Sequence, residues 1–353
     1  MKKYKRILII AVIIISILGL IMIYSSSNIW AQYKYNDSYK YLKTQGIFLI
    51  ISFIILYFIS KIDTLLYKKY SNLIILGCIT LLVLVLIPGI GSIRNGSRSW
   101  FGILGFGIQP SEFTKLGLII YSSKYLSVNK IKGFKSIFPL LMIIVLIFGL
   151  IMLQPDFGTG LIIVGSVAFI MFIAGVDFTF FKVSFIVSIL GIILLIVIAP
   201  YRMKRITSFI NPWSDPLGSG FQIIQSLYAI GPGGLLGMGL GNSIQKHFYL
   251  PEPQTDFIFS IISEELGFMG ILIVASLFIL IIYSGIKISL EQDDLFKKYL
   301  SFGIIFSISF QTLLNLMVVV GLIPVTGVTL PFLSYGGSSL IISMISIGII
   351  LGM

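Results

Sequence analysis

Residues 7–24, ILIIAVIIISILGLIMIY, form an uncharged apolar stretch that follows a basic N-terminus. An α-helix needs about 20 apolar residues to cross a hydrocarbon core about 30 Å thick, so this stretch has the length and composition of a membrane-spanning helix. A secretory signal peptide can look similar, but residues 24–28, YSSSN, are a poor match to the small-residue cleavage site that a signal peptide needs. We therefore expect the stretch to be the first of several spanning helices.

Similar stretches recur along the chain of 353 residues. Hydrophobic residues make up 57% of the sequence and charged residues only 11%, which is less than half of the share usual in soluble domains. The sequence predicts one domain over residues 1–353, an all-α polytopic integral membrane protein with about ten transmembrane helices. The expected helices cover residues 7–24, 45–60, 72–88, 110–126, 137–153, 159–175, 182–199, 260–286, 300–321 and 335–352.

The distribution of basic residues predicts the orientation. With a cytoplasmic N-terminus, 15 of the 25 lysines and arginines fall in inner segments and nine in outer ones, while Lys115 lies inside a helix. Short inner loops are normally the more basic ones. Both termini are therefore expected in the cytoplasm. The net charge of +12 is spread between apolar stretches and forms no continuous stripe, so we expect no nucleic acid partner.

The longest segment between expected helices is residues 201–258, which this orientation places outside the cell between helices seven and eight. Residues 211–216 have turn chemistry, and Phe221–Ile230 is apolar enough for a short interfacial or re-entrant helix. Six glycines follow between positions 231 and 241. Their spacing fits neither a dinucleotide fingerprint nor a phosphate-binding P-loop, so we expect a tight turn packed against other helices.

The inventory of reactive side chains excludes several kinds of site. One cysteine, Cys78, excludes a disulfide framework and a cysteine-based metal cluster, and one histidine, His247, argues against a histidine-rich zinc site. Acid and base chemistry therefore falls to the 13 carboxylates.

Carboxylates within or beside apolar stretches are informative because an ionised group at membrane depth is costly and usually has a partner. Glu112 and Lys115 lie three residues apart on one expected helix, where they can form a structural ion pair. Asp156 follows a Gln-Pro pair, as Ser111 follows Gln109-Pro110. A helix cap and a substrate contact both remain open for Asp156.

The richest stretch is YLPEPQTDFIF at residues 249–259, followed by SEELG at 263–267. Asp256 stands where the long outer loop re-enters the membrane, beside Phe257 and Phe259. Partial desolvation there is expected to raise the pKa of the Asp256 carboxyl, which suits a general base near neutral pH. An N-cap of the following helix is the alternative, and the spacing leaves both interpretations open.

Several long motifs then resemble one family. They are NGSRSW at 95–100, QPSEFTK at 109–115, QPDFGT at 154–159, NPW at 211–213, GLGNS at 239–243, YLPEPQTDFIF at 249–259, SEELG at 263–267, GLIPVTG at 321–327 and PFLSYGGS at 331–338. In this order they are similar to the SEDS family of RodA, FtsW and stage V sporulation protein E, membrane glycosyltransferases that polymerise lipid II into peptidoglycan glycan strands. The loop motifs are more similar to the division and sporulation branch than to RodA.

The resemblance implies ten helices in the bacterial cytoplasmic membrane and an active site on the extracellular side, in the loop 201–258. It maps the catalytic aspartate onto Asp256. It also implies lipid II as substrate, a class B penicillin-binding protein as partner, and a place in the division or elongation machinery or in spore cortex synthesis.

In such a reaction an acceptor hydroxyl attacks the anomeric carbon of the donor, and pyrophosphate leaves. A base must take the hydroxyl proton and cations must stabilise the leaving group. We expect Asp256 to be the base. The residues expected to bind substrate are the cations Arg98, Arg202, Arg205 and Lys246, together with Trp100, Gln109, Asp156 and Glu252.

No cluster of oxygen ligands in the sequence indicates a metal site, and a divalent cation (Mg or Mn) held between Asp256 and a phosphate is left open.

Two other classes of protein compete with the enzyme. A transporter, in particular a flippase for the same lipid, fits the helix count and the buried Glu112. A structural scaffold would not need Asp256 at a lipid boundary. The concentration of motifs on the outer side favours the enzyme.

Overall fold

The computed structural model describes residues 1–94, 96–103, 106–129, 131, 133–184, 186, 191, 203 and 207–353. Nine of the ten expected apolar stretches coincide with helices of the described chain. These helices are α1 (Lys2–Tyr35), α2 (Lys40–Ile59), α3 (Thr64–Leu86), α4 (Pro110–Val128), α5 (Phe134–Met152), α6 (Phe157–Ile173), α10 (Ile258–Leu290), α11 (Leu295–Val319) and α12 (Gly337–Gly352). The remaining stretch, 182–199, lies almost entirely outside the described residues.

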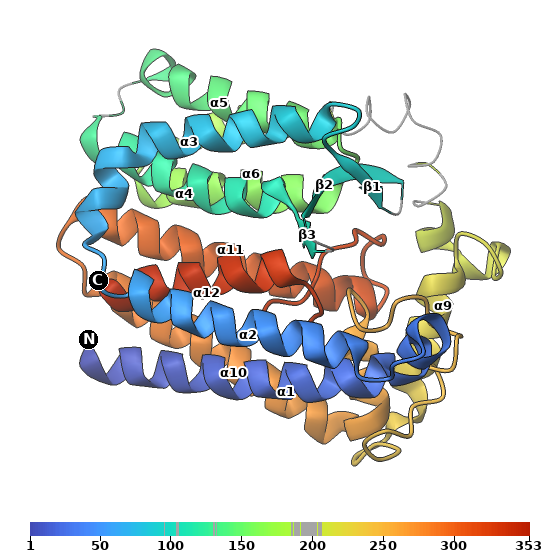
Figure 1. Cartoon of the computed structure of the whole chain (residues 1–353). Helices are drawn as coiled ribbons and strands as arrows, with labels where there is room; N and C mark the ends of the chain where they lie inside the picture. The colour runs from blue at the N-terminus through green and yellow to red at the C-terminus, as the bar shows by residue number, and fades with distance from the viewer. Residues whose placement is uncertain are drawn as a thin grey trace.

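The helices form one bundle with two sides. Six of those described, α1, α2, α3, α5, α10 and α11, are long and apolar enough to cross a membrane, and α6 and α12 are shorter apolar helices. In Figure 1, α3, α4, α5 and α6 lie together above α1, α2, α10 and α12. Helix α11 packs against α4 and α6 on one side and against α10 on the other. Both termini lie at the same end of the bundle (Figure 1).

The opposite end carries a small antiparallel sheet, and we call it the sheet end. Its strands are β1 (Ser92–Arg94), β2 (Ser97–Ile103) and β3 (Phe106–Ile108), in the order β1-β2-β3. Ile93 pairs with Arg98, and Gly102 pairs with Gly107. The chain is therefore not purely helical. The strands are too short and too rich in glycine and serine for an alternating apolar pattern to announce them.

The long loop at the same end contains η1 (Pro212–Ser214), α9 (Phe221–Ile230) and η2 (Gly231–Gly233). Helix α9 has the bounds expected from its sequence. The glycines after it pack against α10, which breaks at Gly267 (φ 62°). The break leaves helix backbone groups without helical partners, and the loop supplies them: Met238 N donates to Glu264 O (2.9 Å), and Phe268 N donates to Gly234 O (2.9 Å). The glycines form the expected tight turn against a helix.

A second irregular segment, residues 320–336, joins α11 to α12, and we call it the α11–α12 segment. Its residues 328 and 330–334 are buried. Side chains satisfy its backbone: Gln311 Nε2 donates to Thr329 O (3.0 Å), and Asn315 Nδ2 donates to Val328 O (2.8 Å). On the α1 side, Gly19 lies so close that an added Cβ would be 2.6 Å from Phe332 O. Backbone without helical bonds is tolerated at membrane depth only when it is buried in protein, as here.

We predict that Gly19→Ala destabilises the protein, because the new methyl group would meet the backbone of the α11–α12 segment, which cannot move like a flexible side chain. The expected loss is about 1–3 kcal/mol. Gly46→Ala on α2 is the matched control, since a Cβ there meets nothing within 4 Å. The measurement is the thermal unfolding midpoint of both purified variants. Equal midpoints for Gly19→Ala and the parent would contradict this packing.

Candidate active site

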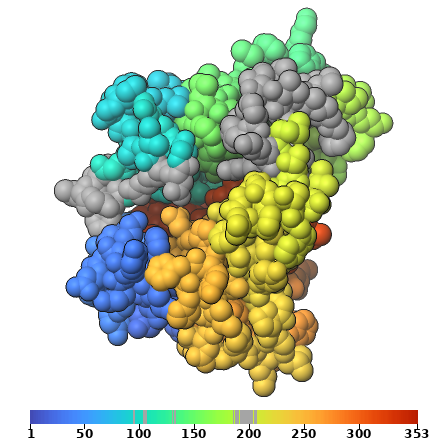
Figure 2. Space-filling model, turned by 90° about the vertical axis from the view of Figure 1, so that its right-hand side faces the viewer, coloured from blue at the N-terminus to red at the C-terminus, as the bar shows by residue number. Residues whose placement is uncertain are grey.

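The sheet end contains a hollow. Figure 2 looks onto this end and shows the hollow between the cyan residues of the sheet region, the blue residues where α1 meets α2, and the yellow and gold residues of the long loop. Dark red residues from the C-terminal part of the chain are visible inside it. The sheet carries Arg98 and Trp100, and the long loop carries Lys246, Glu252 and Asp256.

Asp256 lies at the end of the long loop and is partly exposed. Helix α10 begins two residues later, and its N-cap is Phe257, so Asp256 is not the residue that caps this helix. Asn315 Nδ2 donates to the backbone oxygen of Asp256 (2.7 Å), and Thr255 Oγ1 donates to Asp256 Oδ1 (2.8 Å). The backbone is thus fixed from α11, and the carboxylate accepts from the neighbouring Thr255.

The α11–α12 segment supports the same loop directly. Tyr335 N donates to Gln254 O (2.8 Å), and Asn315 holds both Asp256 and Val328. Two buried acceptor atoms here, Gln254 Oε1 and Asn315 Oδ1, have no hydrogen-bond partner among the described residues. Buried acceptors normally have a donor, and an ordered water supplies it where the protein does not.

Asp156 stands on the other side of this segment. Its Oδ1 accepts from Thr159 N (3.2 Å), so it caps α6, and its Oδ2 accepts from Gln109 Nε2 (3.0 Å) and Ser111 Oγ (3.3 Å). Burial raises the pKa of the Asp156 carboxyl above its ordinary value, against the opposing hydrogen bonds from Thr159. Asp156 therefore acts as the N-cap of α6. The structure also brings it into direct contact with Gln109, a second residue expected to bind substrate.

The turn that holds Asp156 also packs on the α11–α12 segment. A Cβ at Gly158 would lie 2.4 Å from Val328 Cγ2 and 2.9 Å from Thr326 O. From α12, Ser338 Oγ accepts from Gln109 N (3.2 Å) and donates to the backbone oxygen of Gly107 (3.1 Å). One segment and the helix that follows it therefore contact the loops of Asp256, Asp156 and Gln109.

The remaining expected substrate contacts are more dispersed. Arg98 and Trp100 lie on β2 and are partly exposed, and Arg98 Nη1 reaches Leu86 O at 3.5 Å. Glu252 is exposed, in the left-handed backbone region (φ 44°). Arg202 and Arg205 lie outside the described residues. Their role in binding substrate stays a prediction.

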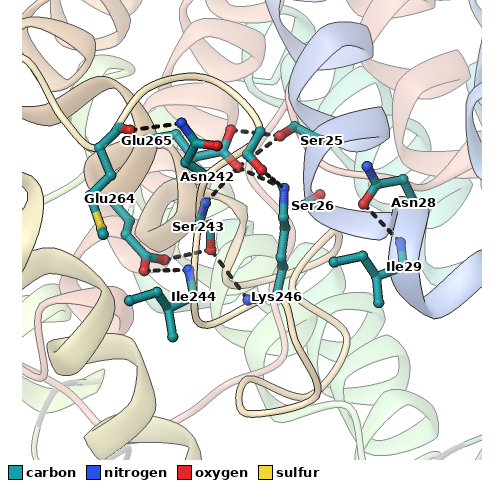
Figure 3. A network of polar contacts seen from close by, with 12 residues as sticks. Ser25, Ser26, Asn28, Ile29, Asn242, Ser243, Ile244, Lys246, Glu264 and Glu265 are labelled. Atoms are coloured by element: carbon teal, nitrogen blue, oxygen red, sulfur yellow. Dashed lines mark hydrogen bonds and ion pairs between the residues drawn. The ribbon is translucent and has the colours of Figure 1, made fainter.

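Lys246 has a more specific environment than the sequence indicated. It is only 3% exposed, its Nζ lies 3.3 Å from Glu265 Oε1, and it donates to Gly241 O (2.5 Å). Ser25 of α1 donates to both oxygens of Glu265, at 2.8 and 2.6 Å (Figure 3). The ammonium is therefore engaged in a buried ion pair that ties the long loop to α10 and, through Ser25, to α1.

Glu264 completes this buried cluster. Its carboxylate accepts from Ser243 Oγ (2.5 Å) and from the backbone nitrogen of Ile244 (2.8 Å). Figure 3 shows Glu264 and Glu265 reaching the same short stretch of loop from neighbouring positions of α10. Sequence reasoning recognised both carboxylates but not Ser25, because 240 residues separate it from Glu265.

Glu112 and Lys115 lie together in the bundle, with Lys115 Nζ 2.8 Å from Glu112 Oε2 and both side chains 8% exposed. Lys115 also donates to Gln311 Oε1 (2.6 Å). Gln311 is the residue whose Nε2 donates to Thr329 O, so the ion pair is connected to the α11–α12 segment. Neither Gln311 nor Asn315 stood out in the sequence.

Within the described residues, no group of three His, Cys, Asp or Glu side chains gathers to hold a metal ion. A divalent cation held between Asp256 and a substrate phosphate stays a prediction.

The fold defines a multi-pass membrane protein whose polar loops meet at one end of the bundle. The chain belongs to the FtsW/RodA/SpoVE family, described as cell cycle proteins, whose profile matches residues 5–353. The expected family is thereby confirmed.

Relatives and solved structures agree over nearly the whole chain. Stage V sporulation protein E of Bacillus subtilis is 51% identical over 98% of this chain and 95% of its own length. A probable peptidoglycan glycosyltransferase FtsW of a Geobacter species is 40% identical, over 99% and 96%. A chain from a peptidoglycan synthase complex that coordinates polymerisation and crosslinking superposes with a TM-score of 0.81 at 29% identity, over 98% and 95%. The rod shape determining protein RodA of Thermus thermophilus gives 0.73 at 26%, over 98% and 94%.

We predict that Glu112→Gln and Lys115→Met each destabilise the protein more than the double substitution does. Either single change strands a buried polar or charged partner in a low dielectric, at a cost of about 3–5 kcal/mol. The measurement is a double-mutant cycle of thermal unfolding in one detergent. Strictly additive losses would show that the two side chains act independently.

Proposed function

We propose that this chain is a peptidoglycan glycosyltransferase that polymerises lipid II into glycan strands, with Asp256 as its general base. The observation that carries the proposal is the placement of Asp256. It lies partly exposed at the end of the long loop, does not cap α10, and has its backbone fixed by Asn315. A partly exposed carboxylate whose backbone is held in place is arranged to act on a ligand at the sheet end. The names of the related proteins agree with this activity.

The reaction extends a sugar chain. The acceptor 4-hydroxyl attacks the anomeric carbon of the donor, the new glycosidic bond forms, and the bond to the polyprenyl pyrophosphate breaks. Asp256 takes the hydroxyl proton as the oxygen attacks, and the pyrophosphate leaves with the electron pair of the broken bond.

Cations are needed for the leaving pyrophosphate. Arg98 on β2 is a partly exposed arginine of the sheet end, and a guanidinium suits phosphate oxygens because it can bind two of them. We propose Arg98, Arg202 and Arg205 for this role. We assign Lys246 a structural role instead, since Glu265 and Gly241 already engage its ammonium.

We propose that the sheet end faces outward from the bacterial cytoplasmic membrane and that both termini are cytoplasmic, with residues 1–353 forming one domain. The end that holds the termini carries most of the basic residues, including Lys2, Lys3, Lys68 and Lys297, as cytoplasmic ends do. An outward active site needs no nucleotide, because lipid II carries its own pyrophosphate leaving group.

We also propose a class B penicillin-binding protein as partner, in the division machinery or in spore cortex synthesis. A solved complex that couples polymerisation to crosslinking contains a chain of the same fold, which supports such a partner. The division and sporulation setting follows from the similarity to stage V sporulation protein E and FtsW. A flippase is not favoured, because the related names describe a transferase and the polar junctions concentrate at one end of the bundle.

The decisive variant is Asp256→Asn, which keeps the shape of the side chain and removes the base. We expect polymerisation of labelled lipid II in detergent to fall about 10²- to 10⁴-fold, with normal folding. Asp215→Asn is the matched control: this carboxylate lies on the same loop, is exposed, and binds Ser219 of its own turn. Near-normal polymerisation by Asp256→Asn would move the base elsewhere, and Glu252→Gln would then be the next variant to measure.

Lys246→Met separates the two roles considered for Lys246. In the structural role it leaves Glu265, which is fully buried, without its counter-charge, so the unfolding midpoint falls and adding Glu265→Gln restores part of it. In a pyrophosphate-binding role, the midpoint would stay near that of the parent while the KM for lipid II rises. We expect the loss of stability.

A further inference from the structure

A groove that the mechanism does not use lies where α1 meets α2. It has a volume of about 480 Å³ and is lined by residues of α1, of the turn that follows it and of the long loop, namely Tyr24, Asn28, Ile29, Gln32, Tyr33, Ser38 and Phe248. We call it the corner groove. In Figure 2 the blue residues of this corner lie beside the gold residues of the long loop, at the border of the hollow.

The lining combines aromatic rings with amides and contains no charged side chain. Tyr33 and Phe248 meet edge to face with ring centroids 5.3 Å apart, and Trp30 contacts Phe248 at 5.5 Å. Tyr24 and Tyr39 stack at 5.1 Å. Rings present flat apolar faces and the amides present donors and acceptors, which matches a pyranose: its C–H face is apolar and its edge carries hydroxyl and acetamido groups.

Basic residues flank this groove. Lys34 Nζ lies 5.7 Å from the ring centroid of Trp30 and 5.5 Å from that of Tyr35, and Lys40 lies over Tyr35 at 6.0 Å. The acidic Asp37 between them is paired with Lys43 at 2.9 Å. The rim is therefore net positive, which suits a polymer that carries carboxylates beside its sugars.

Aromatic rings also connect the groove region with the loop of Asp256. Tyr335, whose backbone nitrogen binds Gln254, meets Tyr41 edge to face at 4.9 Å, and Tyr41 meets Tyr35 at 6.0 Å. Phe248 in the groove belongs to the same loop as Asp256. Ring contacts through Tyr41 of α2 and one continuous stretch of chain thus connect the loop of Asp256 with the surroundings of the corner groove.

We propose that the corner groove binds the growing glycan strand, a β-1,4-linked amino-sugar polymer with acidic side chains, after it leaves Asp256. This inference rests on the proposed function. Aromatic side chains at a membrane surface also anchor proteins to lipid headgroups, and that is the competing explanation. Two amide side chains in the lining, Asn28 and Gln32, and the connection to the loop of Asp256 distinguish a glycan site from an anchoring belt, whose rings need neither.

The probe is chitotetraose, the β-1,4-linked tetramer of N-acetylglucosamine. Trp30 beside Phe248 serves as the reporter once Trp100→Phe and Trp213→Phe have removed the other tryptophans. The titration is made in nanodiscs with the Asp256→Asn protein, so that no turnover occurs. We expect a saturable change in Trp30 emission, and at least about tenfold weaker binding after Gln32→Ala with Tyr33→Ala. Tyr57→Ala, an exposed ring outside the groove, is the matched control and should bind as the parent does.

A titration without saturation, or equal affinity in the groove variant, would overturn the inference. So would emission that follows the phosphatidylglycerol content of the nanodisc and ignores chitotetraose, since that outcome identifies lipid anchoring. If the proposed function is wrong, the parent protein will not polymerise lipid II. If only the groove inference is wrong, the parent will polymerise lipid II and the chitotetraose titration will show no change in emission. In the polymerisation assay, the groove variant is further expected to release shorter strands.

Discussion

The backbone of residues 320–336 must find its hydrogen-bond partners inside the protein, and much of the remaining structure follows from that requirement. This segment runs without helical bonds between α11 and α12, and each unpaired amide or carbonyl in its buried part, residues 328 and 330–334, would cost several kcal/mol. Three amide side chains satisfy part of it: Gln311 binds Thr329 O, Asn315 binds Val328 O, and Gln45 of α2 both donates to Ser334 O and accepts from Gly336 N. An amide serves such a segment well because it carries a donor and an acceptor on one rigid group.

The same requirement explains why α4 contains the buried ion pair of Glu112 and Lys115. Gln311 can present its nitrogen to Thr329 only if its oxygen has a donor on the other side, and Lys115 is that donor. A lysine buried at this depth needs a counter-charge, and Glu112 supplies it one turn away. Glu112 therefore stabilises Lys115, Lys115 positions Gln311, and Gln311 binds the backbone of the segment. The sequence predicted Glu112 and Lys115 only as an ion pair. In the structure this pair also stabilises the irregular backbone of residues 320–336 through Gln311.

The sequence predicted the elements far better than their contacts. Long, mostly apolar stretches identified nine helices of the described chain, and the bounds of α9 followed from its local composition. Helix α1 is longer than its apolar stretch because it continues through polar residues at both ends, where hydrophobicity gives no signal. The sheet was missed since its strands are short. Asp256 and Asp156 stood out by their motifs, and their roles toward a substrate stay predictions. The contact between Gln109 and Asp156 spans 47 positions, and single-sequence patterns hold no information on such contacts.

Sharing one segment has a consequence for the active site. Asp256 is held through Asn315 and Gln254, Asp156 through Gly158, and Gln109 through Ser338, and all three attachments end on residues 326–338. Loops that were each anchored only to their own helices would shift with every small tilt of the bundle, whereas loops anchored to a common segment shift together. Relative geometry among catalytic groups is what a transfer reaction needs, because misplacement by about 1 Å can cost a hundredfold in rate. The irregular segment is thus the element that holds the loops of the proposed site in a constant arrangement relative to one another.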